Sequence, residues 1–363
     1  MKQLMKYVDE YRKKDLILSV TERLRTVSKK DIVLMEVCGG HTMAIHRFGL
    51  HALLPPNIHL VSGPGCPVCV SSQHFIDLAI AYSRIQGIII TTYGDLIRVP
   101  GSSTSLEKER AVGSDIRIVY SVLESLDIAR QNPSKKVIFL GIGFETTAPA
   151  TAAAIIKAKE ENISNFFVLS AHKIMPPVME ALVKEGVKID GFIAPGHVSA
   201  ITGISIYHEL ASKYGLGVVV SGFEPVDMMQ AVLMLVLQIE SSAPMVEVQY
   251  RRVVNTGGNL KAQNLLKKVF EYRDDQWRGL GLIPQSGLKI CEKFSAFDAE
   301  EHFIVEVPES TEPKGCICGQ ILRGLKTPLD CGLFAKKCTP SDPVGACMVS
   351  GEGTCATYYK YRS

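Results

Sequence analysis

The sequence carries little net charge and no long apolar run. Its 40 lysines and arginines against 37 aspartates and glutamates leave a net charge of +3, and no basic tract stands out. A balanced charge of this kind argues against nucleic acid as the main partner. The longest apolar run, near Ala231–Leu237, is far too short to span a bilayer, and residues 1–20 contain no secretory h-region. We therefore expect a cytoplasmic protein that binds neither membranes nor nucleic acid.

Cysteine, in contrast, is plentiful, with 10 in 363 residues. Disulfide frameworks are rare in the cytoplasm, so cysteines there point to metal binding or redox catalysis. The length of the chain is sufficient for two or three domains with a sizeable core.

The apolar pattern predicts an α/β fold. Residues 1–30 show helical spacing and are expected to form an N-terminal helical segment packing on the C-terminal part. From Asp31 onward, short apolar runs alternate with helical patterns in two groups of four strand units, near 31–120 and 135–225. This rhythm is typical of βαβ units and parallel sheets. We predict two similar parallel-sheet α/β domains, residues 31–130 and 131–240, and a small C-terminal cysteine-rich domain, residues 241–363. Strand-end loops would line a cleft between the two halves.

Three cysteines follow two apolar runs that each break into a glycine-rich turn. Cys38 precedes Gly-Gly-His41 at the end of the first run, and the second run ends in Gly-Pro-Gly-Cys66-Pro-Val-Cys69. If the two runs are neighbouring strands, all three thiols emerge at the carboxyl edge where open α/β sheets bind ligands. Such a group could hold a soft metal or perform thiol redox chemistry. The lone C-x-x-C is also compatible with a structural zinc half-site.

Six further cysteines lie within residues 316–355, in a segment with little periodic pattern. A zinc module would favour C-x-x-C pairs, which this segment lacks, whereas an iron–sulfur cluster needs four thiolates and tolerates irregular spacing. We therefore favour a cluster over zinc. The two remaining cysteines could form a redox disulfide beside it. The six are Cys316, Cys318, Cys331, Cys338, Cys347 and Cys355.

The strand-end loops of the second group offer further candidates. The turn Gly141–Thr147 lacks the third glycine of G-x-G-x-x-G and the lysine of a P-loop, which disfavours a nucleotide site. Within it, Glu145 is a candidate acid, base or hydrogen-bond partner, with a helix N-terminal cap as the alternative. His172 and His197 each end a strand. One such histidine is usually structural, but two on neighbouring loops raise the prospect of a site.

The turn "GFEPVD" adds two acidic residues ahead of a long apolar helical pattern. Glu224 and Asp227 are expected to cap or orient that helix.

Several of these motifs together carry a resemblance to a known family. The segments "MEVCGGHT", "GPGCPVCV", "GFETTAPA", "PGHVSAI", "GFEPVD" and "GACMVSGEGTCATYYKY" occur in this order over nearly the whole chain. In this combination the sequence resembles the HypD hydrogenase maturation factors. The resemblance implies a scaffold for assembling the Fe(CN)2CO group of [NiFe] hydrogenases, a complex with the small chaperone HypC, and contact with the cyanide donor HypE. It also implies two related α/β domains followed by a [4Fe-4S] domain.

The resemblance assigns roles to individual residues. Cys38 would be the ligand or anchor of a transient iron that carries cyanide and carbon monoxide, beside His41. Cys66 and Cys69 would be a thiol pair facing that iron. Glu145 and His197, because of their strand-end positions, remain further catalytic candidates. The chain departs from the family pattern at Met43, where a histidine would follow "CGGHT".

The C-terminal segment is implied to resemble ferredoxin:thioredoxin reductase, in which a cluster lies next to a disulfide. By that likeness the redox disulfide would be formed by Cys318 and Cys347. The cluster ligands would be Cys316, Cys331, Cys338 and Cys355. The alternative function, from a different class, is a stand-alone iron–sulfur thiol–disulfide oxidoreductase.

Overall fold

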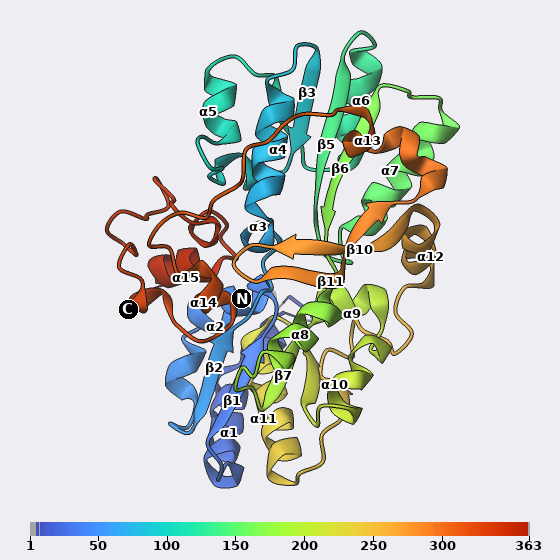
Figure 1. The fold of residues 1–363 in the computed structure, drawn as a ribbon. Coiled ribbons are helices and arrows are strands. Elements are labelled where there is room, and N and C mark those ends of the chain that lie inside the picture. Colours follow the sequence, from blue (N-terminus) through green and yellow to red (C-terminus); the bar gives the residue numbers. More distant parts are fainter. Residues whose placement is uncertain (1–4, 7, 362–363) are drawn as a thin grey trace.

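The computed structural model describes residues 5, 6 and 8–361, which form two parallel sheets, one above the other in Figure 1. The lower, five-stranded sheet has the order β2-β1-β7-β8-β9, with β1 Ile32–Glu36, β2 Ile58–Ser62, β7 Gly191–Pro195, β8 Gly217–Ser221 and β9 Val246–Val248. The upper, four-stranded sheet has the order β4-β3-β5-β6, with β3 Ile88–Thr92, β4 Ile116–Ile118, β5 Lys136–Gly143 and β6 Phe166–His172. The predicted α/β fold with two parallel sheets is confirmed.

The strand membership of the two sheets differs from the prediction. Each sheet takes strands from both sequence blocks: β1 and β2 pair with β7–β9, whereas β3 and β4 pair with β5 and β6. The prediction of two groups of consecutive strand units, within 31–130 and 131–240, is therefore wrong in this respect. Strands β3, β6, β7 and β8 are buried along their whole length. Strands buried on both faces read as uniform apolar runs, which do not specify their neighbours.

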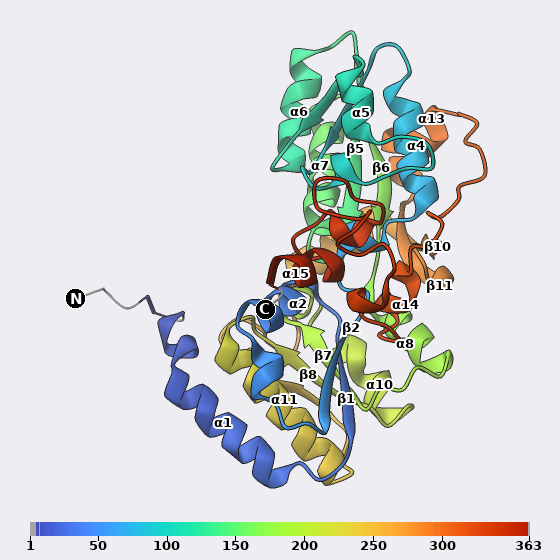
Figure 2. The same ribbon diagram turned by 90° about the vertical axis from the view of Figure 1, so that its left-hand side faces the viewer.

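Helices cover the faces of both sheets, as Figures 1 and 2 show. Those around the lower sheet are α1 Lys14–Val27, α2 Gly39–Arg47, α8 Met175–Lys184, α9 Gly196–Thr202, α10 His208–Ser212 and α11 Pro225–Glu240. Those around the upper sheet are α4 Gln73–Ser83, α5 Leu106–Ala111, α6 Val122–Gln131, α7 Ala148–Glu160 and α13 Ala299–His302. The short helix α3, Pro67–Val70, lies where the chain passes from one sheet to the other. None of the helices built from the described residues is both long and apolar enough to cross a bilayer.

The N-terminal segment packs differently from the prediction. Helix α1 lies along α11, which itself packs on β7 and β8, instead of on the C-terminal part. The preceding 3₁₀ turn η1, Asp9–Arg12, does reach Arg252, whose guanidinium lies 3.7 Å from the ring centre of Tyr11. The predicted start of this segment at residues 1–4, together with residue 7, lies outside the described residues.

An antiparallel hairpin that the sequence analysis did not single out lies between the two sheets in Figure 1. Its strands are β10 Phe270–Trp277 and β11 Gly281–Ile290, and β11 packs on β6 and α8. Helix α12, Leu260–Val269, precedes it and packs on α7.

The cysteine-rich C-terminal segment has few regular elements, as its pattern predicted. It contains α14 Cys318–Leu322, η6 Pro328–Asp330, η7 Ala346–Met348 and α15 Thr354–Tyr361. Helix α15 packs on α2, and η7 packs on α3. The segment therefore lies directly against the loops that carry Cys38 and Cys69.

Candidate functional site

Cys38 leaves strand β1 at the edge where Cys66 leaves β2. The two strands are parallel neighbours in register, with Glu36 opposite Ser62, so the predicted convergence of these turns is confirmed. Their glycine turns interlock: the amide of Gly39 donates to the carbonyl of Gly65 at 3.2 Å. A Cβ added to Gly65 would lie 2.2 Å from the backbone nitrogen of Cys38, so only glycine allows this approach.

Cys38 lines a cavity of about 970 Å³ between the carboxyl-edge loops of the two sheets. Its walls come from the β1, β5, β7 and β8 loops, from η1 and from the C-terminal segment. Its lining residues include Cys38, Met43, His197, Phe223, Arg252 and Glu352. A cleft lined by strand-end loops was predicted. The cleft joins the β1 loop to the β7 and β8 loops because of the strand order, which was not predicted.

The environment of Cys38 keeps its thiol protonated. Burial, followed by the negative charges of Glu352 and Glu36, raises the pKa of Cys38 from 9.0 to about 12. The amides of Gly40 and His41 at the start of α2 lower it, but by less than burial raises it. The buried carboxyl of Glu36 accepts from the Cys38 amide at 3.1 Å and from the Thr42 hydroxyl at 2.5 Å. Near neutral pH the thiol is therefore protonated, and a metal ion that binds it must displace its proton.

The three remaining catalytic candidates of this region lie at different depths. His197 lines the cavity, with its ring stacked 4.1 Å from that of Phe223. His41 is fully buried behind the same ring, 4.7 Å away, with Nε2 3.3 Å from the Ser221 carbonyl, and burial lowers its pKa to about 4. Glu145 is buried behind the cavity and accepts from the amide of Met175, the first residue of α8, at 3.0 Å.

Glu145 therefore acts as a helix cap, which was the alternative to a catalytic role. The helix that it caps is α8, not the helix α7 that follows its own strand. Burial raises the pKa of its carboxyl to about 7. The other strand-end histidine, His172, is also buried and hydrogen-bonds the Thr151 hydroxyl at 3.0 Å, a structural contact.

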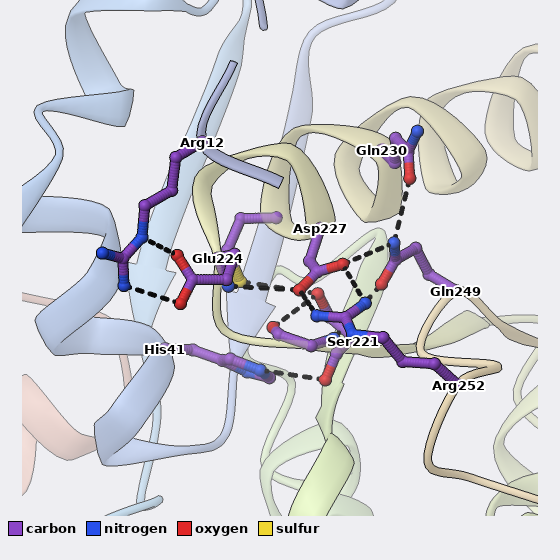
Figure 3. Close-up of polar contacts among 10 residues, drawn as sticks. Arg12, His41, Ser221, Glu224, Asp227, Gln230, Gln249 and Arg252 are labelled. Atoms are coloured by element: carbon purple, nitrogen blue, oxygen red, sulfur yellow. Dashed lines mark hydrogen bonds and ion pairs between the residues drawn. The ribbon is translucent and has the colours of Figure 1, made fainter. Parts of the chain in front are cut away.

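Ion pairs connect the segments at one rim of the cavity, as Figure 3 shows. Arg12 of η1 forms an ion pair with Glu224, and Arg252 donates to both oxygens of Asp227. Gln249 also donates to Asp227, at 2.9 Å. Glu224 and Asp227 form a capping box at the start of α11, which confirms their predicted capping role.

The six C-terminal cysteines line one small cavity. Its remaining walls are apolar, from Ile321, Leu333, Phe334 and Met348, with Gly345 completing them. Burial, and then the charges of Cys316, Cys338 and Cys331, raise the pKa of Cys355, so Cys355 lies within electrostatic reach of the other three thiols. The Sγ atoms of Cys318 and Cys347 lie only 2.7 Å apart.

Cys66 and Cys69 line neither cavity, but Cys69 lies next to Cys347 of the C-terminal cavity. The Cys66 sulfur accepts from the Cys69 amide at 3.3 Å, and Gly65 and Pro67, but neither cysteine, line the cavity of Cys38. Burial raises the pKa of Cys69 well above its ordinary value, and a hydrogen bond with the Cys347 side chain opposes that rise. The structure therefore brings Cys66, Cys69, Cys347 and Cys318 into one line of neighbouring thiols, which the sequence did not reveal.

Among the described residues, no group of three or more His, Cys, Asp or Glu side chains is arranged to hold a single metal ion. A four-iron cluster binds each of its cysteines through a different iron, so its ligands need not converge on one point. The enclosed, apolar, cysteine-lined cavity therefore suits a cluster better than a zinc ion.

Sequence reasoning missed Glu352, Phe223 and Arg252. Glu352 belongs to the C-terminal segment, yet a Cβ at Gly39 would lie 2.6 Å from its Cβ. A signal for Glu352 was present, because it lies in the same "SGEGTC" turn as Cys355 and is flanked by glycines.

The chain is similar in sequence to known hydrogenase maturation factors. The sequence profile of HypD, described as the hydrogenase formation hypA family, matches residues 14–362. The chain is 46% identical over 367 residues to hydrogenase maturation factor HypD of Azotobacter vinelandii, covering 98% of this chain and 97% of that protein. It is 45% identical over 368 residues to the HypD of Cupriavidus necator, with coverages of 98% and 97%. To the HypD of Escherichia coli it is 42% identical over 367 residues, with coverages of 99% and 98%.

Proposed function

The chain belongs to the HypD family of hydrogenase maturation factors, and from this premise we propose that it is a redox-active scaffold on which the Fe(CN)2CO group of [NiFe] hydrogenases is assembled. The observation that most supports this proposal is the pair of adjoining sites. A cavity containing one protected thiol, Cys38, lies beside a line of thiols that ends in the six-cysteine cavity.

Cys38 is the proposed ligand of the cargo iron. Thiolate is a strong donor for iron, and a cavity with mostly apolar walls protects a low-spin centre carrying cyanide and carbon monoxide. Because the Cys38 thiol is protonated, the arriving iron must displace that proton, and the nearby Glu352 carboxylate is positioned to receive it. His197 and Phe223 form the wall beside Cys38 and restrict which ligands can approach.

Four cysteines would hold a [4Fe-4S] cluster: Cys316, Cys331, Cys338 and Cys355. Their shared apolar cavity and mutual electrostatic influence support this assignment. When bound, such a cluster supplies electrons one at a time to a neighbouring thiol pair. Cys318 and Cys347 are the proposed redox disulfide, since their sulfurs are already close together.

The remaining thiols pass reducing equivalents by exchange. The Cys347 thiolate attacks the Cys69 sulfur of a Cys66–Cys69 disulfide, and Cys66 leaves as a thiolate that takes up a proton. The Cys318 thiolate then attacks Cys347 and releases Cys69 as a thiolate, which takes up the second proton. The result is a Cys66–Cys69 dithiol and a Cys318–Cys347 disulfide, with two electrons transferred.

The partners proposed from family membership are a HypC-type chaperone and a HypE-type cyanide donor. Both must reach the Cys38 cavity. Its open rim between η1 and the β8 loop, where Arg12, Glu224 and Arg252 lie, is the proposed approach.

The test combines metal analysis with infrared spectroscopy. We expect about four irons and equal acid-labile sulfide per chain after anaerobic purification, and diatomic-ligand infrared bands on the complex with the chaperone. Cys38→Ala should abolish the bands and leave the sulfide unchanged, whereas Cys291→Ala, a cysteine outside both cavities, should change neither. Bands that survive in Cys38→Ala would refute the scaffold site. One zinc without sulfide would refute the redox role. Turnover of a small disulfide without partners, in a protein lacking the bands, would favour the stand-alone oxidoreductase.

A further inference from the structure

We infer that the tip of the β10–β11 hairpin, Trp277–Leu280, is a positioning element that sets the spacing of the Cys69, Cys347 and Cys318 thiols. This inference rests on the thiol exchange proposed above. The tip contacts the chain immediately after Cys69 on one side and immediately after Cys318 on the other.

On the first side, Arg278 fixes the segment that follows the C-P-V-C turn. Its amide donates to the Val70 carbonyl at 3.0 Å, Nε donates to the Ser71 carbonyl at 2.8 Å, and Nη1 donates to Oε1 of Gln73 at 2.6 Å. Ser71 also forms an antiparallel bridge with Trp277. The end of α3, and with it Cys69, is therefore bound to the hairpin tip.

Arg278 is an unusual residue to bury for stability alone. It is 3% exposed, its Nη2 has no hydrogen-bond partner, and within the described part of the chain no carboxylate pairs with it. A buried cation without a counter-charge is costly, so an apolar residue of similar volume would serve a purely structural role better. An apolar residue could not supply the directional hydrogen bonds that Arg278 donates to residues 70–73.

On the second side, Gly279 packs backbone to backbone against Gly319, the residue after Cys318. A Cβ on Gly279 would lie 2.5 Å from the Gly319 Cα, and a Cβ on Gly319 would lie 2.4 Å from the Gly279 oxygen. Glu312 accepts from the Gly279 amide at 2.7 Å, and Arg323 donates to the carbonyls of both glycines. The start of α14 is therefore also fixed by the tip.

The base of the hairpin is held rigidly enough to fix the position of the tip. The Trp277 indole donates to the Ser286 hydroxyl at 2.8 Å, and the buried Lys173 pairs with Asp275 at 2.9 Å and lies 5.1 Å from the indole. One tip holds the segments that carry Cys69 and Cys318, and Cys347 neighbours both of these thiols, so the distance from each of them to Cys347 depends on the tip. Exchange requires sulfurs in line, and a misplacement of about 1 Å can cost about a hundredfold in rate.

The test isolates two thiols. In a Cys66→Ser/Cys318→Ser background, Cys69 and Cys347 remain as neighbours, and diamide is used to oxidise them in the anaerobic protein. Peptide mass spectrometry under non-reducing conditions gives the rate of Cys69–Cys347 disulfide formation. Gly279→Ala and Arg278→Met should each slow this rate by about tenfold or more.

Gly281→Ala is the matched control. Gly281 lies in the same hairpin and, like Gly279, has a positive φ (85° and 68°), so alanine strains the backbone at both positions. A Cβ at Gly281 would meet nothing within 4 Å, so this variant lacks the clash with Gly319 and its rate should stay near that of the background. Iron and sulfide content should be equal in all variants. Equal content would exclude a general loss of structure as the cause of a slower rate. If Gly279→Ala does not fold, Arg278→Lys, which keeps the charge and loses the forked contacts, takes its place.

The outcomes separate the two proposals. If the background itself forms no Cys69–Cys347 disulfide, the thiol exchange is refuted. If it does, and the Gly279 and Arg278 variants react as fast as Gly281→Ala, the exchange stands and the positioning role of the hairpin tip is refuted.

Discussion

The protonated state of Cys38 leads to a quantitative prediction about its reactivity. Its pKa of about 12, against an ordinary 9.0, means about a thousandfold less thiolate at neutral pH, equivalent to about 4 kcal/mol. Because alkylating agents react with the thiolate, the rate of iodoacetamide modification at Cys38 should rise about tenfold per pH unit from pH about 7 to about 10, without levelling off.

Peptide mass spectrometry resolves Cys38 from the other cysteines, and the urea-unfolded protein is the internal control. In the unfolded chain the rate should level off near the ordinary thiol pKa. Glu352→Gln removes the largest contribution after burial, so the pKa of Cys38 should fall and its rate should begin to level off at lower pH. Poor access would lower the rate at every pH without moving the plateau. A plateau near pH about 9 in the folded protein would therefore refute our account of this site.

Three further predictions concern the walls of the Cys38 cavity. Arg252→Met leaves the fully buried Asp227 carboxylate without its ion-pair partner, so urea unfolding should show a loss of about 3–5 kcal/mol; a loss below about 1 kcal/mol would contradict the pairing. Burial raises the pKa of Glu145 from 4.5 to about 7, so the folded chain binds this proton more tightly than the unfolded chain does. The resulting stabilisation of about 3 kcal/mol is fully present below pH 4.5 and is lost as the pH rises through 7. Glu145→Gln should lack this loss when unfolding is followed across the same pH range, and an unchanged pH dependence would exclude the assignment. Gly65→Ala should displace the Cys38 loop and abolish the infrared bands while sulfide content stays constant, and intact bands would show that the contact is not needed.

The local features of the site could be predicted from the sequence. The glycine turns after β1 and β2 predicted that Cys38 and Cys66 share one edge, because parallel neighbouring strands end on the same side. Glu224 and Asp227 were predicted to cap α11 because acidic residues flanking a proline precede a long apolar helix. In each case the physical cause acts within a few residues, so it leaves a mark in the sequence.

Features that depend on distant contacts could not be predicted. Nothing near Gly39 indicates that Glu352 packs on it, and nothing in the C-P-V-C turn shows that Cys69 faces Cys347. Burial also outweighs a local effect at Cys38. A cysteine at a helix N-terminus suggests a lowered pKa, yet desolvation of Cys38 in the folded chain outweighs the helix amides and raises its pKa.

The interleaved strand order explains why the two sites adjoin. The chain leaves the five-stranded sheet after β2, passes through α3 to build the four-stranded sheet, and returns through α8 after β6. Between β1 and β9 it therefore crosses twice between the sheets, and the first crossing carries Cys69. Two consecutive domains would have needed only one crossing, far from Cys66 and Cys69 in the sequence. Because the crossing starts beside Cys38, a C-terminal segment that packs on both α2 and α3 can present Glu352 to one site and Cys347 to the other.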